Sequence, residues 1–353
     1  MNKIQKIEIK QYRGLKNMTL EKLSRINVLV GENNSGKTSI LEAIELMSKP
    51  FSSVWIFTVA SQRRGLIDGS QIGEVLKWIF PQENNEHKPI ELDLYGDNKK
   101  TSITLVFTEQ EFVDFDLLKN SKGHFLNEEN FATIAEQTIK VKVDGKEKDL
   151  EFKGQFPKGD KSDILYKSAY ISSTAGHHRN ISAERVGEII LTQQKDKLIE
   201  MLQQFDCDIT GIEIVPIGKN DPLSDSNQIY LQKNNQELMP LSSFGEGLQK
   251  VTLIASVLLN RQGSVLLLDE AEVAIHTKMI PTFFEWLSKL AEQNNVTVFM
   301  TTHSLEAVDG VLYANKESLE NLSFYRLEKN KVKRFSGERM YSIRYDFGME
   351  VRG

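Results

Sequence analysis

The stretch GENNSGKT at residues 31–38 decides the fold, because it is a complete P-loop with the spacing Gly-x-x-x-x-Gly-Lys-Thr. The run INVLV at residues 26–30 precedes it and predicts a short buried strand. Apolar residues at helical spacing follow it through residues 39–47 and predict a helix. Strand, glycine-bearing loop and helix, in this order, are the context that the motif requires.

The loop predicts a site for the phosphates of ATP. Its glycines let backbone amides turn inward around phosphate oxygens, and the start of the following helix adds a partial positive charge. We expect Lys37 to reach the β- and γ-phosphates and the Thr38 hydroxyl to bind Mg²⁺. The predicted nucleotide-binding residues of this segment are Gly31, Asn33, Asn34, Ser35, Gly36, Lys37, Thr38 and Ser39.

A second apolar strand ends in two acids. The run VLLL at residues 265–268 leads into Asp269 and Glu270, at the carboxyl end where ligands bind in open α/β sheets. Carboxylate oxygens suit Mg²⁺, so Asp269 joins Thr38 as a predicted metal ligand. Glu270 is predicted to orient or deprotonate the attacking water, and with Lys37 it forms part of the predicted catalytic group.

Two further segments extend this site. The apolar run at residues 296–300 ends in Thr-Thr-His-Ser, where His303 is positioned to contact a γ-phosphate and is the third predicted catalytic residue. The segment LSSFGEGL at residues 241–248 opens a helix and offers free amides to an anion. A simple capping box formed by Ser243 and Glu246 is compatible with that role.

Apolar strands that alternate with helices predict an α/β fold with a parallel sheet covered by helices. Residues 183–206 predict one of these helices. Residues 50–165 differ, because alternating segments and turn residues there predict an antiparallel β-rich lobe with helices near 70–80 and 127–137. The predicted domains are a nucleotide-binding core at 1–50 and 165–325, an inserted lobe at 50–165, and a basic β extension at 326–353.

Composition narrows the class of protein. The 353 residues allow two domains, and the single cysteine, Cys207, excludes an intrachain disulfide framework. No apolar run approaches the roughly 20 residues of a membrane-spanning helix, and the first residues lack a secretory pattern, so we expect a cytoplasmic protein without a membrane partner. The net charge of −5 argues against coating nucleic acid by charge alone, whereas the basic segment after residue 325 leaves nucleic acid open as a partner.

The order of these motifs resembles an ABC-type ATPase head, and more narrowly the SMC/RecF/OLD branch with its stand-alone AAA-15 and AAA-21 ATPases of bacterial anti-phage defence. The stretch IEIKQYRGL at residues 7–15 and the stretch DEAEVAIH at residues 269–276 carry the narrower resemblance, although alanine replaces a usual proline in the second. The resemblance implies that Arg13 lies near the nucleotide. It also implies that the remaining ATP contacts are Ser243, Gly245 and Glu246.

Ser243 and Gly245 match the signature motif of this family, and we call residues 243–245 the signature segment. In this family the motif binds ATP held by a second subunit, so the resemblance implies a homodimer or higher homo-oligomer with ATP sandwiched between heads. We also expect that the fifty residues after His303 are too few for a nuclease domain of about 100 residues, and that an effector is a separate protein. The Q-loop glutamine stays unassigned among Gln62, Gln110 and Gln155.

The sequence therefore predicts Mg²⁺-dependent ATP binding and hydrolysis coupled to head-to-head dimerisation. The predicted biological role is that of a sensor or regulatory subunit in a bacterial anti-phage defence system, controlling an effector such as a TOPRIM-like nuclease. The alternative is a RecF-like DNA-repair ATPase that clamps DNA.

Overall fold

The computed structural model describes residues 4–63, 72–96, 99–113, 133–152, 156–157, 163–173, 183–216, 227–234, 236–260, 263–328 and 331–351. The chain forms two compact units. One contains residues 1–22, 38–166 and 329–332, and the other contains residues 23–37, 167–328 and 333–353. The chain therefore passes from one unit to the other inside the P-loop motif, between Lys37 and Thr38.

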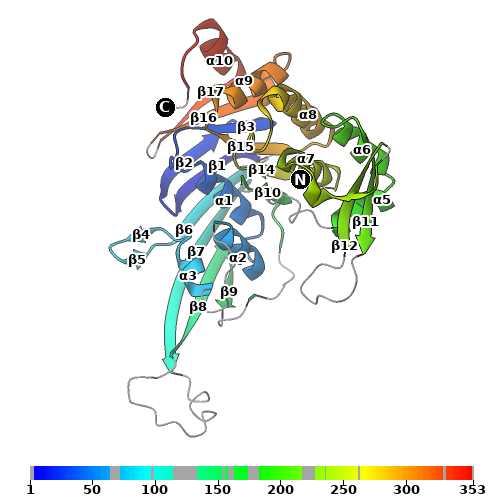
Figure 1. The fold of residues 1–353 in the computed structure, drawn as a ribbon. Coiled ribbons are helices and arrows are strands. Elements are labelled where there is room, and N and C mark those ends of the chain that lie inside the picture. The colour runs from blue at the N-terminus through cyan, green and yellow to red at the C-terminus, as the bar shows by residue number, and fades with distance from the viewer. Residues whose placement is uncertain are drawn as a thin grey trace. The chain divides into compact units, whose positions relative to one another are not determined.

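The second unit is built on a six-stranded sheet in the order β10-β14-β15-β3-β16-β17 (Figure 1). Its strands are β3 (Ile26–Val30), β10 (Ser168–Ile171), β14 (Val265–Leu268), β15 (Thr297–Thr302), β16 (Leu322–Glu328) and β17 (Lys331–Ser336). The strands β10, β14, β15, β3 and β16 pair in parallel. Every residue of β3 and β14 is buried, as expected for a parallel sheet whose two faces are covered. The predicted parallel α/β core is confirmed.

Helices of the same unit supply the apolar cover. They are α5 (Ala183–Leu191), α6 (Lys195–Gln203), α7 (Glu246–Asn260), α8 (Ile280–Gln293) and α9 (Leu305–Ala314), and their buried residues share one core cluster with β3, β14 and β15. A small antiparallel sheet joins them, made of β11 (Ile209–Pro216), β12 (Asn227–Lys233) and β13 (Met239–Pro240). Short 3₁₀ turns lie at Leu241–Ser243, Thr277–Met279 and Leu319–Asn321.

The single helix predicted at 183–206 is two helices. Gln193 adopts a left-handed conformation with φ of 57°. The amides of Gln193 and Gln194 then donate to the carbonyls of Ile190 and Ile189, at 3.0 and 2.9 Å. These bonds satisfy the last carbonyls of α5 and end the helix, although the apolar periodicity continues into α6.

The first unit carries a second six-stranded sheet, in the order β2-β1-β6-β7-β8-β9, and all neighbouring strands in it pair antiparallel. Its strands are β1 (Ile4–Tyr12), β2 (Leu15–Glu21), β6 (Ile90–Gly96), β7 (Lys99–Val113), β8 (Thr133–Val143) and β9 (Lys146–Phe152). In Figure 1, β7 and β8 form a long two-stranded ribbon that extends beyond β6 and β9. The predicted antiparallel strands are confirmed.

The helices of the first unit are α1 (Lys37–Ser48), whose first residue belongs to the other unit, α2 (Ser53–Ser61) and α3 (Ile72–Lys77). A short hairpin of β4 (Gln82–Glu83) and β5 (Glu86–His87) follows α3. The helix predicted near 70–80 is α3. The helix predicted at 127–137 is wrong for residues 133–137, because they pair with β7 as part of β8, and residues 127–132 lie outside the described residues.

The end of the described chain is only partly β structure. After β17 the chain forms α10 (Gly337–Tyr341) and a π-helical turn at Ser342–Asp346, so the β extension predicted for 326–353 is wrong beyond Ser336. The Ser336 hydroxyl accepts a hydrogen bond from the Arg339 amide at 3.3 Å and caps α10. Among the described residues, no helix combines the length and apolar character needed to cross a membrane.

Candidate functional site

The P-loop folds around the side chain of its lysine. The Lys37 ammonium donates hydrogen bonds to the carbonyl oxygens of Gly31 and Glu32, both at 2.7 Å. Gly31 has a φ of +151°, and a Cβ at this position would lie 2.9 Å from the carbonyl oxygen of Leu327. The close approach of β16 to the loop therefore requires glycine at the first position of the motif.

The loop residues fit a phosphate chain. Asn34 and Gly36 adopt positive φ values of 63° and 96°, which turns consecutive amides of the loop to one side. The Ser35 hydroxyl oxygen is buried and has no hydrogen-bond partner in the structure, so it can serve a ligand. Thr38 and Ser39 follow in the first turn of α1.

The predicted acids interact electrostatically with the Lys37 ammonium. Burial lowers the pKa of the Lys37 ammonium, and the carboxylates of Glu270, Asp269 and Glu272 oppose that shift. The Asp269 carboxylate accepts hydrogen bonds from the Thr301 hydroxyl at 2.7 Å and from the Tyr170 hydroxyl at 3.3 Å. Parallel pairing of β14 with β10 and β15 brings these three strand ends together. The P-loop lysine and the acids therefore form one electrostatic cluster.

Glu270 occupies an unusual backbone conformation, with a φ of 45°. Its amide donates to the Thr301 hydroxyl at 2.7 Å, and its carboxylate lies 3.7 Å from Nδ1 of His303. Its side chain is 36% exposed and that of His303 is 47% exposed, so water can reach both groups. The structure thus places Glu270 beside His303, and Lys37 lies within the electrostatic influence of Asp269 and Glu270.

The segment predicted to bind a second nucleotide lies at the start of α7. Ser243 and Gly245 are exposed, and Glu246 is the first helical residue. The capping box predicted from Ser243 and Glu246 is wrong in its geometry. Ser243 ends a 3₁₀ turn, Phe244 is extended, and the position before the helix is Gly245.

One buried residue of this site was missed. Lys250 of α7 is fully buried and donates to backbone carbonyls of the segment that follows β14. The only sequence signal is a lysine on the buried side of an apolar helix, and the position of its partners depends on tertiary packing. A second missed contact joins Thr302 to Glu272, whose carboxylate accepts the threonine hydroxyl at 2.7 Å.

Arg13 belongs to an ion-pair network in the first unit. Its guanidinium lies 2.8 Å from the carboxylate of the fully buried Glu42 and donates to the carbonyl of Trp78 at 3.1 Å. Arg63 binds the other oxygen of Glu42 at 2.6 Å and donates to the Ser39 hydroxyl at 2.9 Å. The network therefore connects both arginines to the first turns of α1. Arg63 is half-exposed and ion-paired with Glu42.

The Q-loop glutamine remains unassigned. Gln62 follows α2 and donates to the carboxylate of the buried Glu45. Gln110 is exposed on β7, and Gln155 lies outside the described residues.

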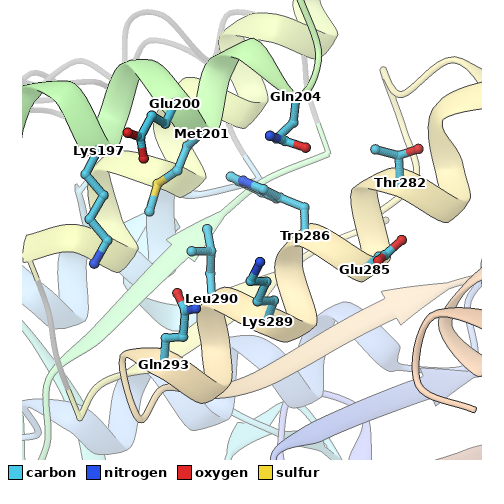
Figure 2. A pocket seen from close by; sticks show the side chains of 10 residues that line it. All are labelled: Lys197, Glu200, Met201, Gln204, Thr282, Glu285, Trp286, Lys289, Leu290 and Gln293. Carbon is cyan, nitrogen blue, oxygen red and sulfur yellow. The ribbon is translucent and has the colours of Figure 1, made fainter. Parts of the chain in front are cut away.

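The structure also contains a groove of about 400 Å³ between α6 and α8 (Figure 2). Met201 and Leu290 line it together with Trp286, which extends from α8 towards α6, and charged groups such as Lys197 and Glu285 stand at its sides. None of the predicted site residues lines this groove. The candidate ATP site therefore does not coincide with it.

The donor set fits a nucleoside triphosphate. A lysine ammonium and an orphaned serine hydroxyl in a positive-φ loop suit phosphate oxygens, and the hydroxyl and carboxylate oxygens of Thr38 and Asp269 are hard donors. An exposed carboxylate beside a histidine can orient a water molecule.

Comparison with known proteins agrees with this geometry. The family model described as "AAA domain, putative AbiEii toxin, Type IV TA system" matches residues 26–309. An "ATP/GTP phosphatase" of Helicobacter pylori is 24% identical over 335 residues, which cover 87% of this chain and 86% of that protein. The "DNA replication and repair protein RecF" of Rickettsia rickettsii is 24% identical over 367 residues, covering 90% of this chain and 98% of RecF.

Among solved structures, an SMC head bound to the C-terminal winged-helix domain of ScpA aligns with a TM-score of 0.48 and 14% identity, over 94% of this chain and 97% of that one. The family match contains the P-loop, the acids after β14 and His303, and it spans most of the chain. The chain therefore belongs to this AAA-domain family, and it is a P-loop ATPase.

Proposed function

We propose that this ATPase binds Mg·ATP, closes as a homodimer or higher homo-oligomer with ATP sandwiched between two heads, and reopens after hydrolysis. In this proposal the head is the core at 1–50 and 165–325, and residues 50–165 form an inserted lobe. Lys37 and the P-loop amides hold the phosphates. Glu270 orients the attacking water and accepts its proton, and His303 contacts the γ-phosphate.

Thr38 and Asp269 would hold Mg²⁺, which would supply positive charge that stabilises the phosphates during hydrolysis. Arg13 contributes a further positive charge near the nucleotide. The remaining contacts come from the partner head. There the amides around Ser243, Gly245 and Glu246, at the N-terminus of α7, bind the γ-phosphate of ATP held by the first head.

The observation that carries the proposal is the exposure of the segment before α7. Ser243 and Gly245 are exposed in a single chain. Backbone amides at a helix N-terminus are strong hydrogen-bond donors to anions, so this exposed helix start is available to a phosphate. Lys37, Asp269 and Glu270 complete a hydrolytic cluster in the same unit. If a second copy of the chain supplies this segment, residues from two heads bind each ATP.

We further propose a role as the sensor or regulatory subunit of a cytoplasmic anti-phage or toxin–antitoxin system. The description of the matched family supports this role, because it names a toxin of a type IV toxin–antitoxin system. In this proposal ATP-driven closure holds or releases a separate effector, for example a TOPRIM-like nuclease.

The direct test uses Glu270→Gln, which keeps the size of the side chain and removes the base. We expect this variant to bind ATP, to hydrolyse it at least about 100-fold more slowly, and to accumulate as an ATP-bound dimer in light scattering. Combining it with Ser243→Arg, which blocks the signature segment, should leave ATP binding intact and return the monomer mass. Hydrolysis by Glu270→Gln at the wild-type rate would show that Glu270 is not the base.

A RecF-like DNA clamp is the second candidate, and the similarity to RecF over 90% of the chain favours it. Such a clamp should bind duplex DNA only with ATP, and its affinity should fall steeply between 50 and 200 mM salt, by about 10³-fold for six phosphate contacts. The defence role predicts instead that the ATP-bound dimer shows no such binding and forms a complex with its effector protein. A salt titration of DNA binding with Glu270→Gln and ATP separates the two.

A further inference from the structure

Lys250 lies at the start of the second turn of α7, and its side chain is completely buried. Its ammonium donates three hydrogen bonds, to the carbonyl oxygens of Glu270 at 3.0 Å, Ala271 at 3.0 Å and Val273 at 2.9 Å. All three N–H groups of the ammonium are therefore directed at one short segment that begins with the predicted catalytic base, Glu270. We call residues 270–274 the catalytic loop.

An ordinary core position would not contain a lysine ammonium. Burying an ammonium is costly unless it is paired and fully hydrogen-bonded, and an apolar side chain of similar volume would serve packing alone. Burial lowers the pKa of Lys250 to about 8, against the opposing field of Glu272, Asp269 and Glu270. The charge is thus retained against a substantial desolvation cost, and its partners are the backbone of the catalytic loop.

The catalytic loop has a backbone that needs external support. Glu270 and Ala274 adopt φ values of 45° and 69°, which L-residues adopt at an energetic cost. The Thr301 hydroxyl accepts a hydrogen bond from the amide of Glu270, and the Thr302 hydroxyl donates to the Glu272 carboxylate. Lys250 binds carbonyls of the same loop.

Helix α7 approaches the loop closely at a second point. A Cβ added to Gly247 would lie 2.6 Å from the carbonyl oxygen of Ala274, so only glycine permits this contact. Gly247 and Lys250 are three residues apart and therefore share one face of the helix. The first two turns of α7 begin directly after the signature segment. They contact the catalytic loop at both ends of the loop, at Glu270 and at Ala274.

We propose that Lys250 is a positioning residue for ATP hydrolysis: by binding the carbonyls of residues 270, 271 and 273 it holds the backbone from which the Glu270 carboxylate projects. It also makes the helix behind the signature segment and the loop that carries the base move as one body. This inference rests on the proposed role of Glu270 as the base. Lys250 itself contacts neither the nucleotide nor the water.

The test is Lys250→Met, which keeps the length of the side chain and removes the charge and all donors. We expect kcat for ATP to fall by about 100-fold, because a misplaced catalytic group costs about that much, whereas KM and the Kd for ATP change by less than about threefold. Rates are expressed per ATP-binding site, measured with a fluorescent ATP analogue, so that unfolded protein does not contribute. Lys250→Arg retains charge and donors and should recover at least about tenfold of the lost rate.

The matched control is Ser256→Ala on the same helix. Ser256 is also completely buried, and its hydroxyl donates to the Leu253 carbonyl at 2.7 Å. We expect this control to lower the thermal midpoint while kcat per binding site stays within about twofold of wild type, since surface and local core changes seldom reach a distant base. Should Lys250→Met bind no ATP, Lys250→Gln takes its place with the same expectations.

Three results would overturn the proposal: a wild-type kcat in Lys250→Met, an equal loss of kcat in Ser256→Ala, or no recovery in Lys250→Arg. Glu270→Gln, assayed in parallel, separates the two levels of inference. If Glu270→Gln hydrolyses ATP normally, the assignment of the base is wrong, and the positioning role falls with it. If Glu270→Gln is inactive and Lys250→Met is normal, only the positioning role is wrong.

Discussion

The ammonium of Lys37 shows how this P-loop is prepared for its ligand. It donates to the carbonyls of Gly31 and Glu32, and the acids that follow β14 favour its charged form. Phosphate oxygens are stronger acceptors for an ammonium than neutral carbonyls are, because the bonds they form are charge-assisted. Binding of ATP can therefore draw Lys37 away from the loop carbonyls at little cost.

Removal of the Lys37 ammonium should weaken ATP binding. Lys37→Ala should reduce ATP affinity by at least about 100-fold, because the loss of a charged hydrogen bond at each of two phosphates costs several kcal/mol. Isothermal titration with ATP measures the effect, and circular dichroism checks the fold. Lys289→Ala, at the groove between α6 and α8, is the control and should bind ATP as wild type does. A Lys37→Ala protein that binds ATP with wild-type affinity would contradict the assignment of the P-loop.

Glu45 of α1 gives a prediction about pH. It is almost fully buried, and burial raises the pKa of its carboxyl from 4.5 to about 8, although a hydrogen bond from Gln62 opposes the shift. Between pH 4.5 and 8 the folded protein holds a proton that the unfolded chain has released. The free energy of unfolding should therefore fall as the pH rises through this window, by at most about 1.4 kcal/mol per pH unit from this group.

Glu45→Gln keeps an acceptor for Gln62 and removes the ionisation. Its free energy of unfolding should lack this dependence and should exceed that of the wild type at pH 8, as urea unfolding between pH 5 and 8 would measure. Glu74→Gln is the control, since Glu74 forms an exposed pair with Lys77 and its loss should leave the slope unchanged. Equal slopes in Glu45→Gln and the wild type would show that Glu45 is ionised in the fold.

At the scale of elements, α8 and α9 pack closely because one residue of α9 has no side chain. A Cβ at Gly310 would lie 2.8 Å from Cγ2 of Ile280 and 3.1 Å from Cδ2 of Phe284. The helix α9 begins directly after the segment that contains His303, with Ser304 as its N-cap. The packing of α9 on α8 therefore helps to fix the end of β15.

We predict that Gly310→Val lowers the free energy of unfolding by about 1–3 kcal/mol, because the added methyl groups overpack this contact. Gly14→Val is the control, because a Cβ at Gly14 meets nothing within 4 Å and its effect should stay below about 0.5 kcal/mol. Urea unfolding at constant pH compares them. If Gly310→Val leaves the free energy of unfolding unchanged, α8 and α9 can move apart without losing stability.

At the scale of the whole molecule, the proposed sandwich makes each ATP site a product of two chains. Lys37→Ala keeps an intact signature segment, and Ser243→Arg keeps an intact P-loop. Each variant alone should be inactive, and an equal mixture should recover about a quarter of the wild-type rate, because half of the dimers are mixed and each contains one complete site. A mixture as inactive as its components would contradict a shared site, and activity of Ser243→Arg alone would place the whole site in one chain.

Most of the predicted fold and candidate site rests on short sequence patterns. The P-loop, the acids after residues 265–268 and His303 were found because each depends on a short motif beside a buried strand, and parallel pairing then places strand ends at one edge. Errors arose where a pattern was continued too far. One helix was predicted across Gln193, and another was predicted over residues 133–137, which pair in register with β7.

What the sequence by itself determined is the class of fold and the residues of the candidate site, because the phosphate-binding loop at residues 31–38 and the strand ending in acids at residues 265–270 are each encoded in one short stretch. Only the tertiary structure revealed what holds these groups. Lys250 meets carbonyls twenty or more residues away, and Arg13 and Arg63 meet on Glu42, which is far from both in sequence. Such contacts have no local signature, because backbone carbonyls are present in every residue and only packing determines which of them a buried charge can reach.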